Sequence, residues 1–357
     1  MGDLDPRASA LLLGLAIGVT FGAAGRWSGF CVRGAIEDAL TKADAPRLRG
    51  YLVAAIVALI GVEALAATGA IDLTKSIYLP GALPLGGAVL GGLMFGAGMV
   101  LTGGCGARML VLAAGGNLRS VVSLLVMGLV SYATLRGVLA PPRQSFSTAT
   151  GFALGVADQS LPTILARLTG LSDNVARWLI VALLVVPALL FVVRRRVAAK
   201  HLVGGALIGL LVPAGFAATG IIGADEFQPM ALESITVTGP WAQTIVYLLT
   251  YTGAALEFGI TWALGIPIGA AIVALARGEM KLEGFDGAAA TGRYITGGVL
   301  MGVGGVLALG CTIGQGLSGV STLSLGSLLA FVSIFTGAAA MMKWRARGVA
   351  GAPVSPR

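Results

Sequence analysis

The chain has 357 residues, of which 56% are hydrophobic and 11% charged, and its mean hydropathy is +0.91. Soluble domains are about 25% charged, so this composition excludes an ordinary soluble protein. The apolar runs are continuous rather than alternating, which predicts membrane-spanning helices and not a barrel. The net charge of +8 comes from short loops between these runs, so we expect topology signals and no nucleic-acid partner.

Nine spans are predicted along the chain, in an all-α polytopic fold. Their ranges are near 10–31, 51–68, 84–104, 120–138, 177–193, 202–221, one crossing within 241–276, 295–310 and 324–342. Residues 139–171 are predicted to form an external half-helix or amphipathic stretch. Because 241–276 is too long for one crossing, we predict a re-entrant half-helix near Glu257–Pro267.

Two sequence patterns occur twice and indicate an internal duplication. G-x-G, followed after five residues by G-C, occurs at 96–105 and again at 302–311. G-F-[C/A]-x-x-G occurs at 29–34 and at 215–220. Such self-similarity is typical of a repeat architecture. The predicted organisation is one transmembrane domain with repeat halves 1–193 and 194–346, followed by a short cytoplasmic tail, 347–357.

Equivalent loops of the two halves carry opposite charge. The loop after the first G-F pattern contains Lys42 and Arg47, whereas the loop after the second contains Asp225 and Glu226. Basic loops stay in the cytoplasm, so the halves are predicted to have inverted topology. The N-terminus is then periplasmic and the C-terminus cytoplasmic, in a bacterial inner membrane.

The three cysteines lie at interruptions of these spans, each beside or near a glycine. The pairs are Gly29 with Cys31, Gly104 with Cys105, and Gly310 with Cys311. A half-helix that starts at such an interruption presents free N–H groups and partial positive charge, which suits an anion. A polarizable thiol suits a ligand that exposes sulfur. A single cysteine would more often be a small buried hydrophobe, but three at repeat-related interruptions favour a substrate path.

Four further residues are candidates for that path. Arg108 would either balance the charge of an anion or anchor the cytoplasmic face. Gln315 follows Cys311 by four residues, so on a helix it would share that face and bind substrate oxygens. Glu63 and Glu257 interrupt apolar runs. They would serve either to couple protons to transport or to stabilise the structure, and we favour the structural role.

These motifs, their spacing and the chain length resemble the YeeE/YedE family of sulfur transporters from about residue 10 to 342. The family's three cysteines match Cys31, Cys105 and Cys311. The resemblance implies an hourglass-like fold of nine spans with half-helices facing each other. It also implies that thiosulfate passes between thiols through S–H contacts, and that a small cytoplasmic sulfurtransferase of the TusA/YeeD type is a partner.

Two alternatives stay open from the residues alone. A membrane thiol oxidoreductase needs two cysteines within disulfide reach, and the chain has no CxxC. A permease for Cu(I) would use thiolates and the ten methionines. With one histidine, His201, a metal site is not expected. We therefore expect a transporter of a sulfur-containing anion, not an enzyme, with no cofactor and no bound metal.

Overall fold

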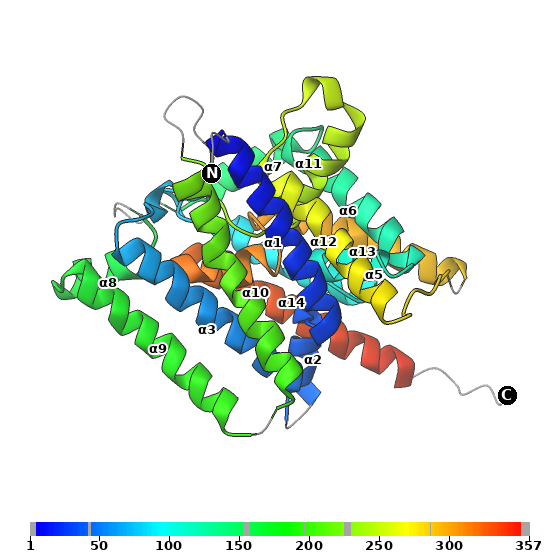
Figure 1. The fold of residues 1–357 in the computed structure, drawn as a ribbon, viewed down its shortest axis with the longest axis horizontal. Coiled ribbons are helices and arrows are strands. Elements are labelled where there is room, and N and C mark those ends of the chain that lie inside the picture. The colour runs from blue at the N-terminus through cyan, green and yellow to red at the C-terminus, as the bar shows by residue number, and fades with distance from the viewer. Residues whose placement is uncertain are drawn as a thin grey trace.

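The computed structural model describes residues 5–41, 44–152, 158–195, 197–224, 230–285 and 287–350, and these residues form a helical bundle (Figure 1). The first part comprises α1 (Pro6–Ser28), α2 (Val32–Thr41), α3 (Pro46–Ala67), η1 (Leu73–Lys75), η2 (Gly87–Gly91), α4 (Gly92–Thr102), α5 (Gly106–Ala113), α6 (Leu118–Leu135), α7 (Ala140–Ala149) and α8 (Leu161–Thr169). The second comprises α9 (Asp173–Val193), α10 (Ala199–Ala217), η3 (Ala218–Ile222), α11 (Thr238–Leu249), η4 (Tyr251–Gly253), α12 (Phe258–Ala276), α13 (Ala288–Leu307), η5 (Gly314–Gly319), η6 (Val320–Thr322) and α14 (Leu325–Ala350).

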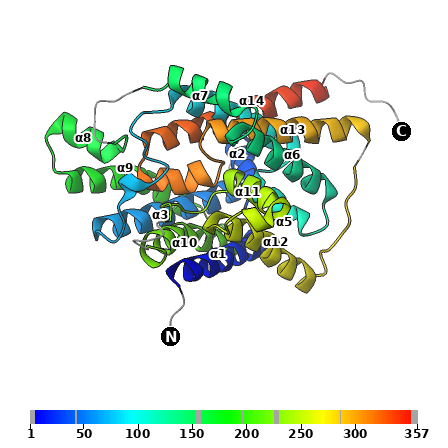
Figure 2. The same ribbon diagram turned by 90° about the horizontal axis from the view of Figure 1, so that it is seen from above.

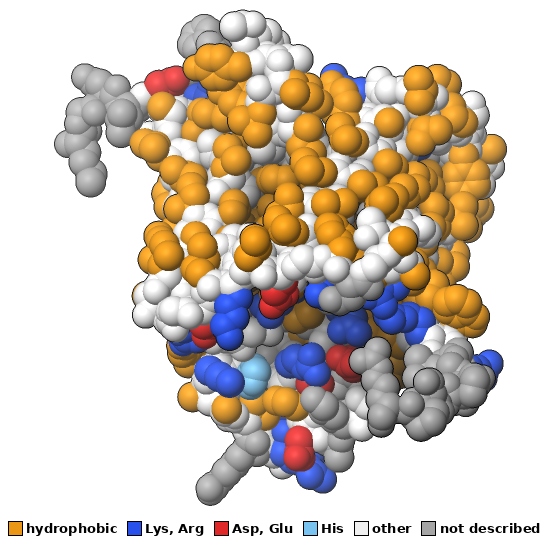
Figure 3. Space-filling model, turned by 90° about the vertical axis from the view of Figure 1, so that its right-hand side faces the viewer, with side chains coloured by type: hydrophobic (Ala, Val, Ile, Leu, Met, Phe, Trp, Pro, Cys, Tyr) orange, Lys and Arg blue, Asp and Glu red, His pale blue; other side chains and the backbone are white. Residues whose placement is uncertain are grey.

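Within these described residues, 8 helical stretches are long and apolar enough to cross a membrane. The ninth expected span is α13, a 20-residue helix that falls short of the others in apolar content. Figure 3 shows hydrophobic side chains over most of one face, with lysine and arginine side chains gathered in a band below them. The chain is an all-α polytopic membrane protein, as its composition predicts.

One end of the bundle carries a group of basic side chains. At this end α1 and α12 end, and α3 and α13 begin. We call it the basic face, and its residues are Arg26, Arg33, Arg47, Arg49, Arg277, Lys281 and Arg293. The salt bridge between Arg26 and Glu279, with 3.0 Å between Nε and Oε2, joins the ends of α1 and α12 there. We call the other end the opposite face.

The predicted half-helix near Glu257–Pro267 is wrong. Residues 258–276 form one continuous helix, α12, and Pro267 lies inside it. The short helix of this region comes earlier, as α11 (Thr238–Leu249). Membrane helices accommodate an internal proline because their neighbours satisfy the freed backbone groups, so Pro267 does not mark an interruption here.

Two other boundaries differ from the sequence predictions. Residues 139–171 contain two short helices, α7 and α8, rather than one. The last apolar span ends at Arg347, and α14 continues to Ala350, so the predicted tail from residue 347 begins within this helix. Lys42, Asp225 and Glu226, whose charges predicted the loop sides, lie outside the described residues.

Glycines bring the central helices into close contact. On α1, Gly14, Gly18 and Gly22 follow each other at intervals of four and face α12. A Cβ added to Gly22 would lie 2.0 Å from the carbonyl oxygen of Ile266, and one added to Gly269 would lie 1.9 Å from that of Val19. Small residues at this spacing let two backbones approach in a membrane. The α1–α12 pair is therefore fixed by backbone contact.

The helix pairs of the first half have counterparts in the second. α1 packs against α12, and α10 packs against α3; α6 packs against α13, and α14 against α4. A duplication would produce this pairing, although the inversion of the halves stays a prediction. Figure 2 shows α8 and α9 at one edge of the bundle, where α9 contacts chiefly α3 and α8.

Replacing Gly22 by alanine should destabilise the protein by about 2 kcal/mol or more, because its methyl group would push the α1 and α12 backbones apart. Gly25→Ala is the matched control on the same helix, since its Cβ would meet Val111 Cγ2 at an ordinary 3.6 Å. Thermal unfolding of the detergent-solubilised protein measures both. Equal melting temperatures for the two variants would contradict the close α1–α12 contact.

Candidate functional site

Each cysteine begins a short helix, and two of the sulfurs accept a hydrogen bond from the amide three residues later. The Gly34 and Gly314 amides donate to the sulfurs of Cys31 and Cys311, both at 3.4 Å. Cys105 is the N-cap residue of α5, and its side chain makes no capping hydrogen bond. Helix-starting amides lack partners within their own helix, so the thiols occupy the position of capping side chains.

Glycines end the helices that precede two of these cysteines. Gly29 ends α1 with φ 70°, and Gly103 ends α4 with φ 83°. Both angles lie in the left-handed region, where glycine has no steric penalty. The sequence identified Gly29 but pointed to Gly104 rather than to Gly103. Gly104 and Gly310 instead make room for neighbouring side chains. A Cβ on Gly104 would lie 3.1 Å from Arg108 Cγ, and a Cβ on Gly310 would lie 3.2 Å from Gln315 Cγ.

Three short-helix N-termini meet in the centre of the bundle. A Cβ on Gly106, the first residue of α5, would lie 3.1 Å from Cγ1 of Val237, the residue before α11. A Cβ on Gly314, the first residue of η5, would lie 2.3 Å from Oγ1 of Thr236. The N-termini of α5, α11 and η5 are thus in mutual contact. Each adds partial positive charge to the same place.

The segment 230–237 enters this centre in extended form from the opposite face. Side chains of other elements hold its carbonyl groups: Ser318 Oγ donates to the Ile235 oxygen at 2.7 Å, and Trp262 Nε1 donates to the Thr236 oxygen at 2.6 Å. The Thr236 hydroxyl lies 3.9 Å from the sulfur of Cys311. The sequence analysis missed this segment, which has neither glycine nor proline to mark it.

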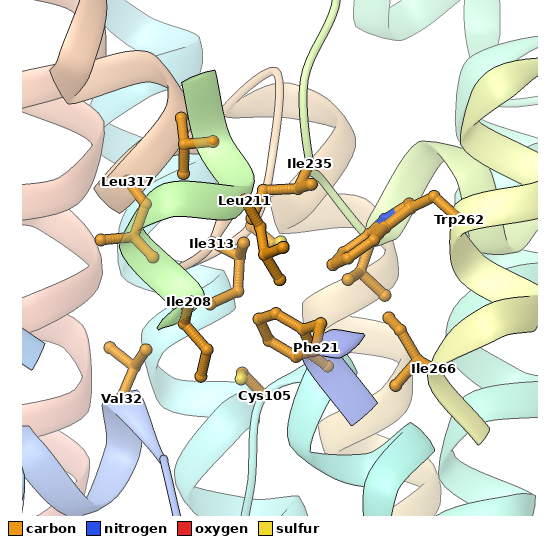
Figure 4. Packing of buried hydrophobic residues seen from close by; sticks show 14 of the residues in the cluster. Phe21, Val32, Cys105, Ile208, Leu211, Ile235, Trp262, Ile266, Ile313 and Leu317 are labelled. Carbon is orange, nitrogen blue, oxygen red and sulfur yellow. The ribbon is translucent and has the colours of Figure 1, made fainter. Parts of the chain in front are cut away.

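The thiols lie at different depths. Cys105 and Cys311 are buried, with exposures of 2% and 1%, whereas Cys31 is half-buried. Cys105 is within electrostatic reach of both other thiols, and the Thr312 side chain lies beside it. Figure 4 shows Phe21, Ile208 and Val32 around Cys105. The surroundings of the central thiol are therefore almost entirely apolar.

Arg108 and Gln315 both make contacts that shape the backbone. Arg108 Nη1 donates to the Gly25 carbonyl at 3.4 Å, which ties α5 to the end of α1. Gln315 Nε2 donates to the Ala308 carbonyl at 2.7 Å, so the amide caps the end of α13. The side-chain amide oxygen of Gln315, Oε1, is buried, and no described group donates a hydrogen bond to it.

The two carboxylates do not reach the thiols. Glu63 is 2% exposed and pairs with Arg177 of α9, with 3.2 Å between Oε2 and Nε. It lines a hollow of about 260 Å³ with Asp72, Asp158 and others at the opposite face. Glu257 was expected inside an apolar span, and this is wrong: it is exposed at the start of α12, because residues 254–257 are not helical.

The three cysteines are free thiols. In the part of the chain that the structure describes, no cluster of three or more His, Cys, Asp and Glu side chains is arranged to hold a metal ion. The groups that meet at the centre are thus thiols, hydroxyls and backbone amides. Such groups can bind an anion weakly and release it without a chemical step.

A family model for sulphur transport matches residues 27–340. The chain belongs to the sulphur transport family. The match includes all three cysteines and confirms the YeeE/YedE resemblance. Among curated relatives, the thiosulfate transporter TsuA of Escherichia coli strain K12 is 28% identical over 332 residues, which is 87% of either chain. The thiosulfate transporter TsuA of Spirochaeta thermophila is 27% identical over 334 residues, 91% of this chain and 96% of that protein.

Gly103 and Gly104 provide a test of how this family member interrupts its fourth helix. Gly103→Ala should destabilise the protein by about 1 kcal/mol, because alanine resists a left-handed φ. Gly104→Ala should have a smaller effect, since the flexible Arg108 side chain can move aside. Melting temperatures in detergent compare the two, and a larger loss for Gly104→Ala would contradict the assignment of Gly103 as the C-cap.

Proposed function

We propose that this chain takes up thiosulfate across the bacterial inner membrane along a path that contains Cys311, Cys105 and Cys31. Membership of the sulphur transport family and the names of both TsuA relatives support the substrate. The observation that carries the proposal is the contact of three short-helix N-termini around the buried thiols. Their combined positive charge attracts an anion into an apolar interior.

The arrangement suits passage rather than tight binding. A thiol donates a weak hydrogen bond and is polarizable, so it recognises the outer sulfur of thiosulfate without holding it. The charged groups near the path, Arg33 and Arg108, lie towards the basic face and not between the buried thiols. The anion therefore leaves the centre without breaking a buried ion pair, which would slow release.

The surroundings of the thiols support one order along the path. Cys311 is next to the segment 230–237, which comes from the opposite face. Cys105 is within reach of both other thiols, and Cys31 precedes α2 with Arg33 and Arg47 nearby. We place Cys311 first, Cys105 second and Cys31 last, with the basic face in the cytoplasm.

The remaining candidates support this path indirectly. Gly29, Gly104 and Gly310 allow the backbone to turn or pack beside each cysteine, and Gln315 fixes the end of α13. Arg108 anchors α5 and adds positive charge below Cys105. Glu63 is structural, because Arg177 neutralises it far from the thiols, and Glu257 has no role in the path.

A cytoplasmic partner belongs to the same proposal. The basic face would receive a small sulfurtransferase of the TusA/YeeD type, as the family resemblance implies. Its arginines lie where thiosulfate leaves Cys31, so they favour anion release towards that partner.

Orientation is tested with reporters. A reporter fused after Arg357 should report the cytoplasm, and one inserted between Asp225 and Gln228 should report the periplasm, because basic loops stay inside. Signals from the same side for both would contradict the predicted orientation of the second half.

Serine variants distinguish the role of the cysteine sulfur in substrate contact from its role as a helix N-cap. Cys105→Ser and Cys311→Ser should lower thiosulfate uptake about tenfold or more, equivalent to about 1.4 kcal/mol, because a hydroxyl is harder and less polarizable than a thiol. Serine is also a favoured N-cap, so neither variant should lose thermal stability. Uptake of labelled thiosulfate into cells without their own importers measures the effect at equal protein level.

Alanine variants at the same positions complete the comparison. Cys105→Ala and Cys311→Ala lose both the cap and the sulfur, so they should be inactive and somewhat less stable. If the thiols were only buried hydrophobes, alanine would be tolerated and serine would be destabilising. Unchanged uptake in either serine variant, or a disulfide between two of the three cysteines seen as a reducible gel shift, would sink the thiol path.

A further inference from the structure

The hydroxyl of Tyr78 is a buried polar group that the proposed path does not use. Tyr78 lies between η1 and η2, is 2% exposed, and packs its ring edge-on against Phe216 with 6.5 Å between centroids. Its hydroxyl is buried and, among the described residues, makes no hydrogen bond of good geometry. Leaving such a group unpaired lowers stability, so it calls for an explanation.

That hydroxyl points to the start of the helix at Cys311. A Cβ added to Gly314, whose amide donates to the Cys311 sulfur, would lie 3.5 Å from the Tyr78 oxygen. The thiol of Cys311 is within electrostatic reach, and the hydroxyls of Thr236 and Ser318 are close. Ser318 has already given its proton to the Ile235 carbonyl. Tyr78 therefore presents a buried O–H donor beside the first thiol of the path, with the hydroxyls of Thr236 and Ser318 as its polar neighbours.

Thr312 presents a second buried hydroxyl. It follows Cys311 in the chain, has an exposure of 0%, and its Oγ1 has no hydrogen-bond partner of good geometry in the described structure. Its side chain lies beside the thiol of Cys105. The two hydroxyls thus flank the step from Cys311 to Cys105, one near each thiol. The side chains of Phe21, Ile208 and Ile313, which Figure 4 shows in the same cluster, are apolar.

We propose that Tyr78 and Thr312 form an oxyanion subsite that donates hydrogen bonds to the sulfonate oxygens of thiosulfate while its outer sulfur contacts Cys311 and then Cys105. This inference rests on the proposed transport of thiosulfate and adds how the other end of the anion is recognised. The thiols bind the soft sulfur and the hydroxyls bind the hard oxygens. Sulfide, which has no oxygens, gains nothing from the subsite.

Because neither hydroxyl makes a hydrogen bond of good geometry among the described residues, we expect their removal to have opposite effects on affinity and stability. Tyr78→Phe and Thr312→Val each keep the side-chain shape and remove one donor. Each should raise the KM for thiosulfate about tenfold, as for loss of a hydrogen bond to a charged group. The melting temperature without substrate should stay the same or rise, since a buried unpaired group is lost. If a hydroxyl were purely structural, its removal would lower the melting temperature and leave the KM unchanged.

The measurement uses the full-length protein reconstituted in liposomes, with labelled thiosulfate at varied concentration and thermal unfolding without substrate. Tyr251→Phe is the control for Tyr78, because Tyr251 is 69% exposed on η4. Thr244→Val is the control for Thr312, because the buried Thr244 hydroxyl donates to Pro240 within α11 at 2.7 Å. Both controls should keep the KM of the unaltered chain.

The outcomes separate the two proposals. No thiosulfate uptake by the unaltered chain would refute the proposed function, and the subsite with it. Normal uptake by the unaltered chain, with a KM within about twofold in both Tyr78→Phe and Thr312→Val, would refute the subsite alone. A lower melting temperature with unchanged KM would also refute it, since both hydroxyls would then be structural.

Discussion

The structure depends on one constraint: a helix that is interrupted inside a membrane must satisfy its end groups within the protein. The sulfurs of Cys31 and Cys311 accept one amide each at these ends, and Cys105 occupies the cap position of α5, but sulfur is a weak acceptor. The amides keep much of their attraction for a stronger acceptor. The same constraint therefore makes the interruptions stable and leaves them able to attract an anion.

Close glycine contacts make this arrangement possible. The unpaired ends of α5, α11 and η5 would separate if the surrounding helices could spread, because like partial charges repel. Backbone contact at Gly22 and Gly269 holds α1 to α12, and contact at Gly98 and Gly297 holds α4 to α13. The high glycine content, 55 residues, is thus largely a packing requirement around the site. Helix packing explains far more of these glycines than the turns beside the cysteines do.

The spans and the three interruptions could be predicted because their signals are local: apolar runs of sufficient length, and cysteines beside glycines. The re-entrant segment could not, because residues 230–237 have the hydroxyl and β-branched composition of many membrane segments and are fixed by Ser318 and Trp262. The sequence also placed Glu257 wrongly, because no local signal marks the end of the non-helical segment before α12. Apolar residues flank Glu257 on both sides, and the turn before it has no proline. Gly103 and Gly104 are adjacent, so only the backbone angles distinguish them.

Tyr78 shows most clearly what a single sequence leaves out. Its partners come from residues 216, 236, 311 and 318, all more than a hundred positions away in the chain, so no local pattern identifies it. It comes from the first half, whereas Cys311 and Thr236 come from the second, and Cys105 of the first half meets Thr312 of the second. Neither half assembles the centre alone. In the proposed path, each buried thiol lies next to a hydroxyl from the other half, so that the sulfur and the oxygens of one small anion would be bound at the same time.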